Sequence, residues 1–230
     1  MNDNLRYERK FVVNQQYDKH QIEQVLKLHP AGFSEIHQSR YINNIYLDTP
    51  NFLFYYDNNS GKSKRQKARI RWYGDLEGKV KKPILEIKIK YGAVGDKLSF
   101  PLKPFILDKD LTQGDLHQIF RESDLPLDIF EFVTPLSPKL INRYRRKYFQ
   151  SFDKIFRSTI DDQLTYIDFG NNHNTILNRV VTDSTYVVEL KYAYDKDDKA
   201  SRVTDLFPFR MTKSSKYVNG IDAFNKTLAV

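Results

Sequence analysis

The chain has 230 residues, and its 37 Lys and Arg residues outnumber its 29 Asp and Glu residues, which gives a formal net charge of +8. A hydrophobic content of 40% is sufficient for one sizeable core, and the positive excess predicts an anionic partner without specifying which one. The absence of cysteine excludes disulfide frameworks, thiolate zinc sites and cysteine nucleophiles, and it fits a reducing compartment.

The first part of the chain is predicted to consist mainly of strands. The alternation of apolar or aromatic residues with charged ones indicates strands at residues 5–13, 36–47, 66–73, 84–91 and 97–102. One helix is predicted at 19–28, where the apolar residues share one face and Asp18 stands at the N-cap position. Residues 58–64 are typical of a loop.

The second part combines helices with further strands. Five prolines between residues 101 and 138, together with helical periodicity at 115–121, predict a helical insertion between two groups of strands. Further strands are predicted at residues 140–152, 156–160, 165–169 and 185–194. Residues 195–201 are typical of a loop, and a last helix is predicted at 220–228.

Charged residues recur at every second position in several of these strands, so that each strand has a charged face and an apolar face. The alternating residues are Arg6, Glu8 and Lys10; Lys67, Arg69 and Arg71; Glu86, Lys88 and Lys90; Arg157, Thr159 and Asp161; and Glu189 and Lys191. For any one strand, a solvated outer face is the simpler interpretation. It does not explain the whole set, because most of the alternating positions on several strands are basic.

Like charges on one sheet face repel each other, by a few tenths to about 1 kcal/mol for each directly opposed pair. We therefore expect an anion to offset them. If the sheet closes into a barrel with this face inward, the lumen becomes a basic tunnel suited to several linked phosphates. The glutamates would then be ligands for a divalent metal that bridges phosphate oxygens.

Short motifs along the chain resemble, in the same order, those of VTC domains, which belong to the triphosphate tunnel metalloenzyme superfamily. They are residues 6–11 (RYERKF), 45–49 (IYLDT), 67–74 (KARIRWYG), 85–88 (LEIK), 144–149 (YRRKYF), 157–161 (RSTID), 188–191 (VELK) and 213–217 (KSSKY). The resemblance implies an α+β, mainly β fold in a single domain over residues 1–230: a closed antiparallel β-barrel, the triphosphate tunnel, with flanking helices. It also implies a metal-dependent polyphosphate polymerase that transfers the γ-phosphate of ATP to a growing polyphosphate chain, with Mn²⁺ or Mg²⁺ as cofactor.

The resemblance also assigns roles to individual residues. The catalytic residues that it implies are Lys10, Arg69, Arg71, Lys88, Arg146, Arg157 and Lys216. The substrate-binding residues that it implies are Glu8, Glu86, Lys191, Lys213 and Ser215. Glu189 resembles the metal-coordinating glutamate, whereas Tyr46 and Asp48 lie in a motif expected to be mainly structural.

The first strand departs from the pattern of the hydrolytic branches, and two adjacent arginines compete for one inward position. In hydrolytic branches of the superfamily the first strand carries glutamates at alternate positions before its lysine, but here Arg6 takes the first of these positions. The loss of a carboxylate favours the holding of a phosphate chain over the activation of water. Arg145 and Arg146 point to opposite faces of a strand, and the resemblance favours Arg146 as the inward one.

The sequence leaves other functions open. A non-catalytic module that senses polyphosphate, inositol phosphate or nucleotide is one, although the late KSSK motif and Glu189 favour an enzyme. A triphosphatase is another, which Arg6 disfavours. Trp72 and Tyr73 could stack on a base or pack in the barrel wall. Nucleic acid is not expected as a partner, since the aromatic residues mostly alternate with the charges, as core residues do.

ATP and polyphosphate are therefore the expected ligands. No apolar run approaches the ~20 residues of a membrane span, and the polar first five residues lack the apolar stretch of a signal peptide. We expect a cytoplasmic protein, which a membrane-protein partner could hold at the inner face of a membrane. The sequence does not reveal the oligomeric state.

Overall fold

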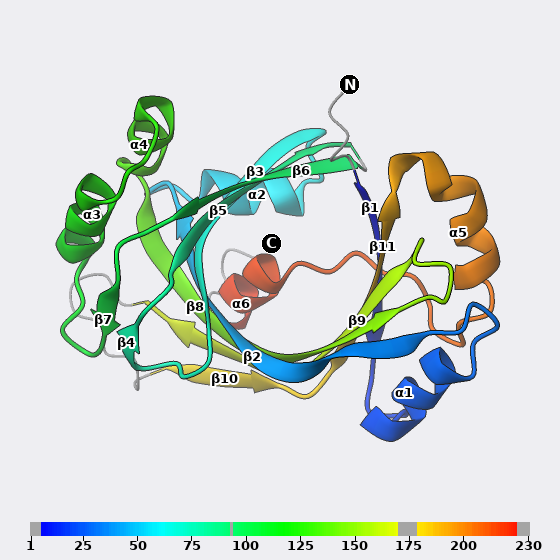
Figure 1. The fold of residues 1–230 in the computed structure, drawn as a ribbon. Helices are drawn as coiled ribbons and strands as arrows, with labels where there is room; N and C mark the ends of the chain where they lie inside the picture. The colour runs from blue at the N-terminus through cyan, green and yellow to red at the C-terminus, as the bar shows by residue number, and fades with distance from the viewer. Residues whose placement is uncertain (1–5, 93, 170–178, 225–230) are drawn as a thin grey trace.

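The computed structural model describes residues 6–92, 94–169 and 179–224. Its main strands are β1 (Arg6–Val13), β2 (Ser34–Asp48), β3 (Lys64–Tyr73), β5 (Ile84–Tyr91), β6 (Val94–Pro101), β8 (Ser137–Gln150), β9 (Arg157–Asp168) and β11 (Tyr186–Ala193). They pair in the order β9-β11-β1-β6-β5-β3-β2-β8, and β8 pairs again with β9, which closes an antiparallel ring. The expected mainly β fold with a closed antiparallel barrel is confirmed, and Figure 1 looks into the ring.

β1 pairs with β11 along its whole described length, and among the described residues it pairs with β6 through Arg6 and Gly95. Three short strands lie outside the ring: β10 (Val180–Asp183) pairs with β9, and β4 (Gly78–Val80) pairs with β7 (Phe105–Leu107) in a separate small sheet.

Helices cover the ring on two sides (Figure 1). Helices α1 (Lys19–Lys27) and α5 (Asp197–Thr204) lie at the right of this view, and α3 (Gln113–Glu122) and α4 (Leu127–Val133) lie at the left. The Asp18 carboxylate accepts a hydrogen bond from the Gln21 backbone N–H, so the expected N-cap of α1 is confirmed. The helical insertion expected in the proline-rich middle is α3 and α4. In the parts of the chain that the structure describes, no helix is long and apolar enough to cross a bilayer.

Two further helices pack against each other. These are α2 (Leu53–Asn59) and α6 (Lys216–Phe224). The buried Asp48 carboxylate accepts hydrogen bonds from the backbone N–H groups of Phe54 and Tyr55 at the start of α2, and from the Tyr217 hydroxyl of α6 at 2.6 Å. Asp48 therefore fixes α2 to α6, which agrees with the mainly structural role expected for it.

Several predicted elements are wrong. Residues 195–201, predicted as a loop, belong to a 3-10 turn at Tyr194–Lys196 and to α5. The apolar periodicity of α5 is weak because it buries only Ala200 and Val203. Residues 58–64, also predicted as a loop, contain the end of α2, which was not predicted, and the start of β3.

The other differences concern boundaries. The two strands predicted at 156–160 and 165–169 form the single strand β9, in which Gln163 has a φ of +52° beside a register shift. This irregularity explains why the alternation breaks there. The last helix begins at Lys216 rather than at 220, and its predicted residues 225–228 lie outside the described residues.

Apolar packing on the outside of the barrel determines which faces of the strands point inward. The apolar faces of β2, β3 and β5 pack against the α3–α4 insertion, around Leu107, Leu116 and Val133. Those of β1 and β11 pack against α1 and α5, around Leu26 and Val203. Because successive side chains of a strand point to opposite faces, the charged faces of these strands must point into the ring.

A third core lies inside the ring, where α6 packs against inward-facing residues such as Tyr46, Leu140 and Tyr144. The contact is close at Gly220, where an added Cβ would lie 2.3 Å from Leu140 Cδ2. Helix α6 thus fills one part of the interior with apolar side chains and leaves the other part to the charges.

Candidate functional site: a cation-lined lumen

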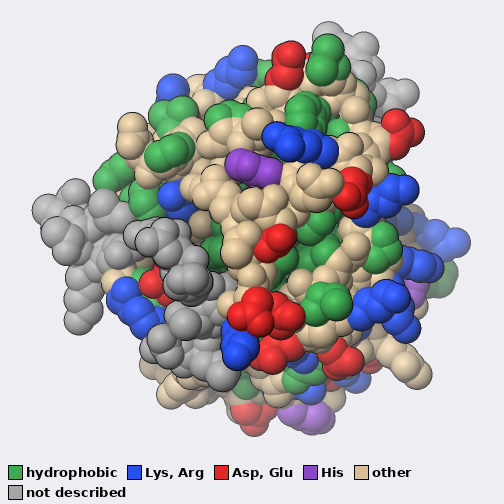
Figure 2. Space-filling view, turned by 90° about the vertical axis from the view of Figure 1, so that its left-hand side faces the viewer, with side chains coloured by type: hydrophobic (Ala, Val, Ile, Leu, Met, Phe, Trp, Pro, Cys, Tyr) green, Lys and Arg blue, Asp and Glu red, His purple; other side chains and the backbone are tan. Residues whose placement is uncertain are grey.

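The charged part of the lumen is a pocket of about 220 Å³. Its cationic lining residues are Arg6, Lys10, Lys67, Arg69, Arg71, Lys88, Lys90, Lys97, Arg146, Lys191 and Lys216, and its carboxylates are Glu8, Glu86, Asp96 and Glu189. These eleven cations and four carboxylates give the lining a formal excess of seven positive charges. On the outer face shown in Figure 2, by contrast, basic and acidic side chains are interspersed with apolar ones.

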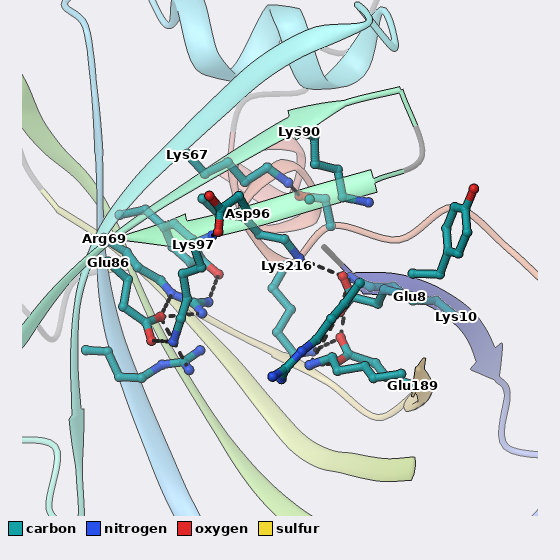
Figure 3. A pocket seen from close by; sticks show the side chains of 18 of the residues that line it. Glu8, Lys10, Lys67, Arg69, Glu86, Lys90, Asp96, Lys97, Glu189 and Lys216 are labelled. Carbon is teal, nitrogen blue, oxygen red and sulfur yellow. Dashed lines mark hydrogen bonds and ion pairs between the residues drawn. The ribbon is translucent and has the colours of Figure 1, made fainter. Parts of the chain in front are cut away.

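Glu86 organises one group of cations, at the left of Figure 3. Its Oε2 accepts a hydrogen bond from Arg69 Nε at 2.8 Å and lies 2.7 Å from Arg69 Nη2, and its Oε1 accepts a hydrogen bond from Lys97 Nζ at 2.6 Å. Arg71 Nη1 lies 3.4 Å from Oε2. Burial alone would raise the pKa of Glu86, but Arg69, Arg71 and Lys97 overcome this effect and hold the pKa well below its ordinary value.

Glu8 and Glu189 organise a second group, which the pairing of β1 with β11 brings together. Glu8 is directly opposite Lys191 and Lys10 is directly opposite Glu189, so the charges alternate across the two strands. Lys10 Nζ lies 3.3 Å from Glu189 Oε1, and Lys191 Nζ lies 3.1 Å from Glu189 Oε2. Lys88 Nζ donates to Glu8 Oε2 at 2.6 Å. The surrounding cations hold the pKa of both carboxyl groups well below the ordinary value, although burial opposes this.

The two adjacent arginines of β8 point to opposite faces. Arg146 lines the pocket, where its guanidinium contacts Asp161 and Glu189. Arg145 lies on the outer side, where it donates to both Asp162 oxygens at 2.9 Å. The structure therefore places Arg146 in the lumen, as the resemblance favours.

The segment before α6 lies along β1 and brings its side chains to the lumen. The Thr212 backbone N–H donates to the Lys10 carbonyl oxygen at 2.8 Å, and Lys10 Nζ donates to the Ser214 carbonyl oxygen at 3.0 Å. Ser215 and Lys216 then line the pocket at the start of the helix. The Ser215 hydroxyl accepts a hydrogen bond from Lys67 Nζ at 2.6 Å.

Not every lysine of the lumen is compensated by a carboxylate. Among the described residues, Lys67 has no carboxylate oxygen within 4.0 Å of its Nζ. Burial and the neighbouring Lys10, Lys88 and Lys90 hold the pKa of Lys67 well below its ordinary value. Burial, together with Lys10 and Lys191, lowers the pKa of Lys88 to about 8 in spite of its contact with Glu8. The lumen therefore holds more positive charge than its own carboxylates offset.

Most of the residues that the resemblance singles out lie in this pocket. They are Glu8, Lys10, Arg69, Arg71, Glu86, Lys88, Arg146, Glu189, Lys191, Ser215 and Lys216. Arg157 and Lys213 do not line it. Arg157 is directly opposite Lys191 but is the exposed first residue of β9, and Lys213 is exposed in the segment before α6.

Further residues of the lumen had no assigned role. Lys67 and Lys90 line it and belong to the alternating pattern, which is a signal that could have identified them. Lys97 reaches the lumen because it pairs with Lys88, a register that the sequence does not reveal. Tyr46, expected to be mainly structural, lines the pocket and stacks on Tyr217.

Trp72 has a packing role rather than a binding one. It is buried, and its indole N–H donates to the Asp75 carbonyl oxygen at 2.9 Å. Its ring contacts Phe105 of β7 edge to face. The alternative of base stacking therefore does not apply to Trp72, whereas Tyr73 is exposed.

A divalent metal fits the lumen only together with a phosphate chain. The described residues contain no group of three or more His, Asp or Glu side chains that could hold a metal ion. Glu189 and Glu8 are close enough to share Lys10 and Lys191 as partners, so together they could supply two carboxylates to an ion. Mg²⁺ and similar ions are commonly held by one or two carboxylates plus substrate phosphates. The donor set fits such a shared site.

An eight-stranded antiparallel ring around an inward-facing array of lysines, arginines and glutamates defines a protein of the triphosphate tunnel class. Two solved structures with this fold are similar to the chain. HpAC1 from Hippeastrum, described as having a dominant triphosphatase activity, is 12% identical with a TM-score of 0.53, and the match covers 94% of each chain. The PH1819 protein from Pyrococcus horikoshii OT3 is also 12% identical, with a TM-score of 0.51, over 94% of this chain and 98% of that one.

The family model of the VTC domain matches residues 5–225, and the chain therefore belongs to the VTC domain family. A comparison with curated proteins finds no match. The fold and the family together imply phosphate-containing ligands.

Proposed function

We propose that this protein is a metal-dependent polyphosphate polymerase, which transfers the γ-phosphate of ATP to the end of a polyphosphate chain inside the lumen. The observation that carries this proposal is the formal excess of seven positive charges among the residues that line the lumen pocket. Burial and the positive charge of neighbouring lysines lower the pKa values of Lys67 and Lys88. Several linked phosphates would offset this charge along the whole lumen.

Phosphoryl transfer needs positioning and charge neutralisation more than it needs a covalent nucleophile. The forked guanidinium groups of Arg69 and Arg71 suit two oxygens of one phosphate, and Lys10, Lys88 and Lys191 suit further oxygens as point charges. An oxygen of the terminal acceptor phosphate attacks the γ-phosphorus of ATP. The bond from this phosphorus to the β,γ-bridging oxygen breaks, and ADP leaves. Because the acceptor phosphate is already ionised, no strong general base is required.

Glu189, with Glu8 beside it, would hold the divalent ion. Such an ion would supply further neutralisation of the phosphate charge. The residues of the chain would then hold the acceptor end and the γ-phosphate in line.

Polymerisation is favoured over hydrolysis by the residues around the carboxylates. Arg6, which replaces a glutamate of the hydrolytic branches, lies in the pocket lining. Glu8, Glu86 and Glu189 are all paired with cations, and their pKa values are lowered, so they are weak bases toward water. A non-catalytic sensor would not need the paired carboxylates at all.

The test is to incubate the purified protein with ATP and Mn²⁺ and to resolve polymer on a gel and small phosphates by chromatography. Long polymer with ADP is the expected result. Orthophosphate without polymer would show a triphosphatase, the activity described for HpAC1. Tight phosphate-chain binding without any turnover would show a sensor. The cytoplasmic location, and a membrane-protein partner that could hold the protein at the inner face of a membrane, stay predictions.

A further inference from the structure

Asp161 lies directly behind the lumen and is completely buried. Its two oxygens accept hydrogen bonds from Arg146 Nε at 2.5 Å and from Arg146 Nη2 at 2.6 Å. Lys216 Nζ lies 2.5 Å from Asp161 Oδ2. Two cations from distant parts of the chain, one on β8 and one at the start of α6, therefore share one carboxylate that does not itself line the pocket.

The same two cations also contact Glu189, but less closely. Arg146 Nη2 lies 3.1 Å from Glu189 Oε2, and Lys216 Nζ lies 3.9 Å from Glu189 Oε1. Both cations also lie over the ring of Tyr144, at 5.2 Å and 4.6 Å from its centroid. Asp161, Arg146, Glu189 and Lys216 thus form a closed ring of alternating charges, in which Asp161 is the inner carboxylate and Glu189 faces the lumen.

We propose that Asp161 is a positioning residue, which keeps Arg146 and Lys216 in place and compensated when Glu189 turns to a divalent ion and the phosphate chain. The inference rests on the proposed phosphate-chain function of the lumen. Without Asp161, Glu189 would be the carboxylate that has to compensate both buried cations. Its release to an ion would then leave two buried charges unpaired, which is strongly unfavourable. Asp161 therefore makes Glu189 available as a ligand.

The neighbouring residue offers a matched control. Asp162 accepts two hydrogen bonds from Arg145 at 2.9 Å and lies 2.8 Å from Lys19 Nζ. It is thus the same residue type with the same kinds of partner, on the outer side of the barrel. A merely structural effect of losing a paired aspartate should appear in both variants, whereas an effect on the lumen should appear only at Asp161.

The experiment compares wild-type protein, Asp161→Asn and Asp162→Asn by calorimetric titration with inorganic triphosphate, first in EDTA and then at increasing Mn²⁺ concentrations. In EDTA, Asp161→Asn should keep its affinity for triphosphate within about threefold, since Arg146 and Lys216 remain cationic. Mn²⁺ is expected to increase the affinity for triphosphate. The Mn²⁺ concentration at which half of this increase is reached should rise by about 10–100-fold in Asp161→Asn, the usual effect of removing a residue that supports a metal ligand. Asp162→Asn should behave as the wild type does.

Equal Mn²⁺ dependence in the two asparagine variants would overturn the inference and leave the proposed function intact. No binding of triphosphate by the wild type would overturn both. If Asp161→Asn does not fold, Asp161→Glu keeps the charge and moves it by one methylene. A wild-type Mn²⁺ dependence in that folded variant would contradict a positioning role.

Discussion

At the scale of single residues, the lumen contains two kinds of cation. Burial would lower the pKa values of Arg69 and Lys10, but Tyr46 and Glu86 raise that of Arg69, and Glu8 and Glu189 raise that of Lys10. Burial and neighbouring lysines lower the pKa values of Lys67 and Lys88, in the case of Lys88 in spite of its contact with Glu8. The first kind is held in place by the protein before any ligand binds. The charged form of the second kind is stabilised most when an anion binds. We therefore test the first kind by its effect on turnover and the second kind by the pH dependence of binding.

Replacement of residues that line the lumen should slow turnover strongly without unfolding the protein. We expect Lys10→Ala, Arg71→Ala and Glu189→Ala to lower the polymerisation rate by about 10²–10³-fold, the usual cost of removing one group that stabilises transition-state charge. Lys79→Ala changes an exposed lysine of β4 and should leave the rate unchanged. Thermal unfolding of each variant checks the fold. Wild-type rates in all three lumen variants would contradict the assignment of this pocket as the active site.

The lowered pKa of Lys88 predicts proton uptake on ligand binding. Its pKa is about 8 in the folded protein, against about 10.4 for an ordinary lysine, so near pH 9 Lys88 is mostly neutral while the lumen is empty. A phosphate chain favours the charged form, so binding should take up protons at this pH, and affinity should fall as the pH rises through 8. Calorimetry in buffers of different ionisation enthalpy measures the uptake.

Lys88→Arg is the control, because arginine stays charged at this pH. Ionisation of the ligand itself contributes equally in both proteins. An uptake that is the same in Lys88→Arg and in the wild type would show that Lys88 does not titrate near pH 8.

At the scale of elements, β-strands could be predicted better than helices because the alternation of charge and apolarity is carried by each strand itself. β3 and β5 show it at nearly every position, since one face is packed and the other is lined with charge. Helices α2 and α5 lack a comparable signal. Helix α5 is held by polar contacts, such as those of Arg9 with Thr204 and Asp197, which depend on the barrel being formed. No local pattern of its own sequence contains that information.

Helix α6 depends on a glycine where it enters the barrel. Alanine at position 220 would gain about 1 kcal/mol of helix propensity. Its Cβ, however, would lie 2.3 Å from Leu140 Cδ2 and 2.7 Å from Tyr166 Cδ1, both in fully packed side chains. Overpacking of this kind costs about 1–3 kcal/mol, so Gly220→Ala should lower the melting temperature.

Gly114→Ala is the matched control in α3. An added Cβ there meets only Thr112 Oγ1, at 3.5 Å, so this variant should be neutral or slightly more stable. If both alanine variants melt at the same temperature as the wild type, α6 does not pack as closely as the structure indicates.

At the scale of the whole molecule, the residues of the candidate site could be predicted because strand alternation decides which side chains face inward. Glu8, Lys10, Arg69 and Glu189 follow from it once the barrel is assumed to close. The alternation predicts residues at the ends of strands less well. Arg157 is at an inward-facing position of the alternation, but it lies at the exposed start of β9 and does not line the pocket. Lys97 could not be predicted, because it depends on a pairing between β5 and β6.

The buried glutamates should make the whole barrel sensitive to acid. The pKa values of Glu8, Glu86 and Glu189 are lower in the folded state than the ordinary value of about 4.3, so the folded state binds fewer protons than the unfolded one. Their stabilising contribution is therefore complete above about pH 5 and is lost as the pH falls below the unfolded value. The melting temperature should fall steadily from pH 5 to pH 3.

Glu86→Gln tests this relation. The variant should be less stable than the wild type at pH 7, because three cations lose their partner, and its melting temperature should depend less on pH between 5 and 3. Glu122→Gln, which changes a residue at the exposed end of α3, should have the wild-type dependence. An unchanged pH dependence in Glu86→Gln would show that another group is responsible for the acid sensitivity.

The pairing of β1 with β11 has a consequence for synthesis on the ribosome. Arg9 and Tyr192, whose side chains are hydrogen-bonded between these two strands, are 183 positions apart. During synthesis β1 therefore cannot pair with β11 until β11 has been made. Non-local pairings of this kind slow folding and leave nascent chains open to aggregation. The alternating charges at Arg6, Glu8 and Lys10, which line the lumen in the folded protein, keep the unpaired β1 hydrated and disfavour its pairing with a strand of another chain.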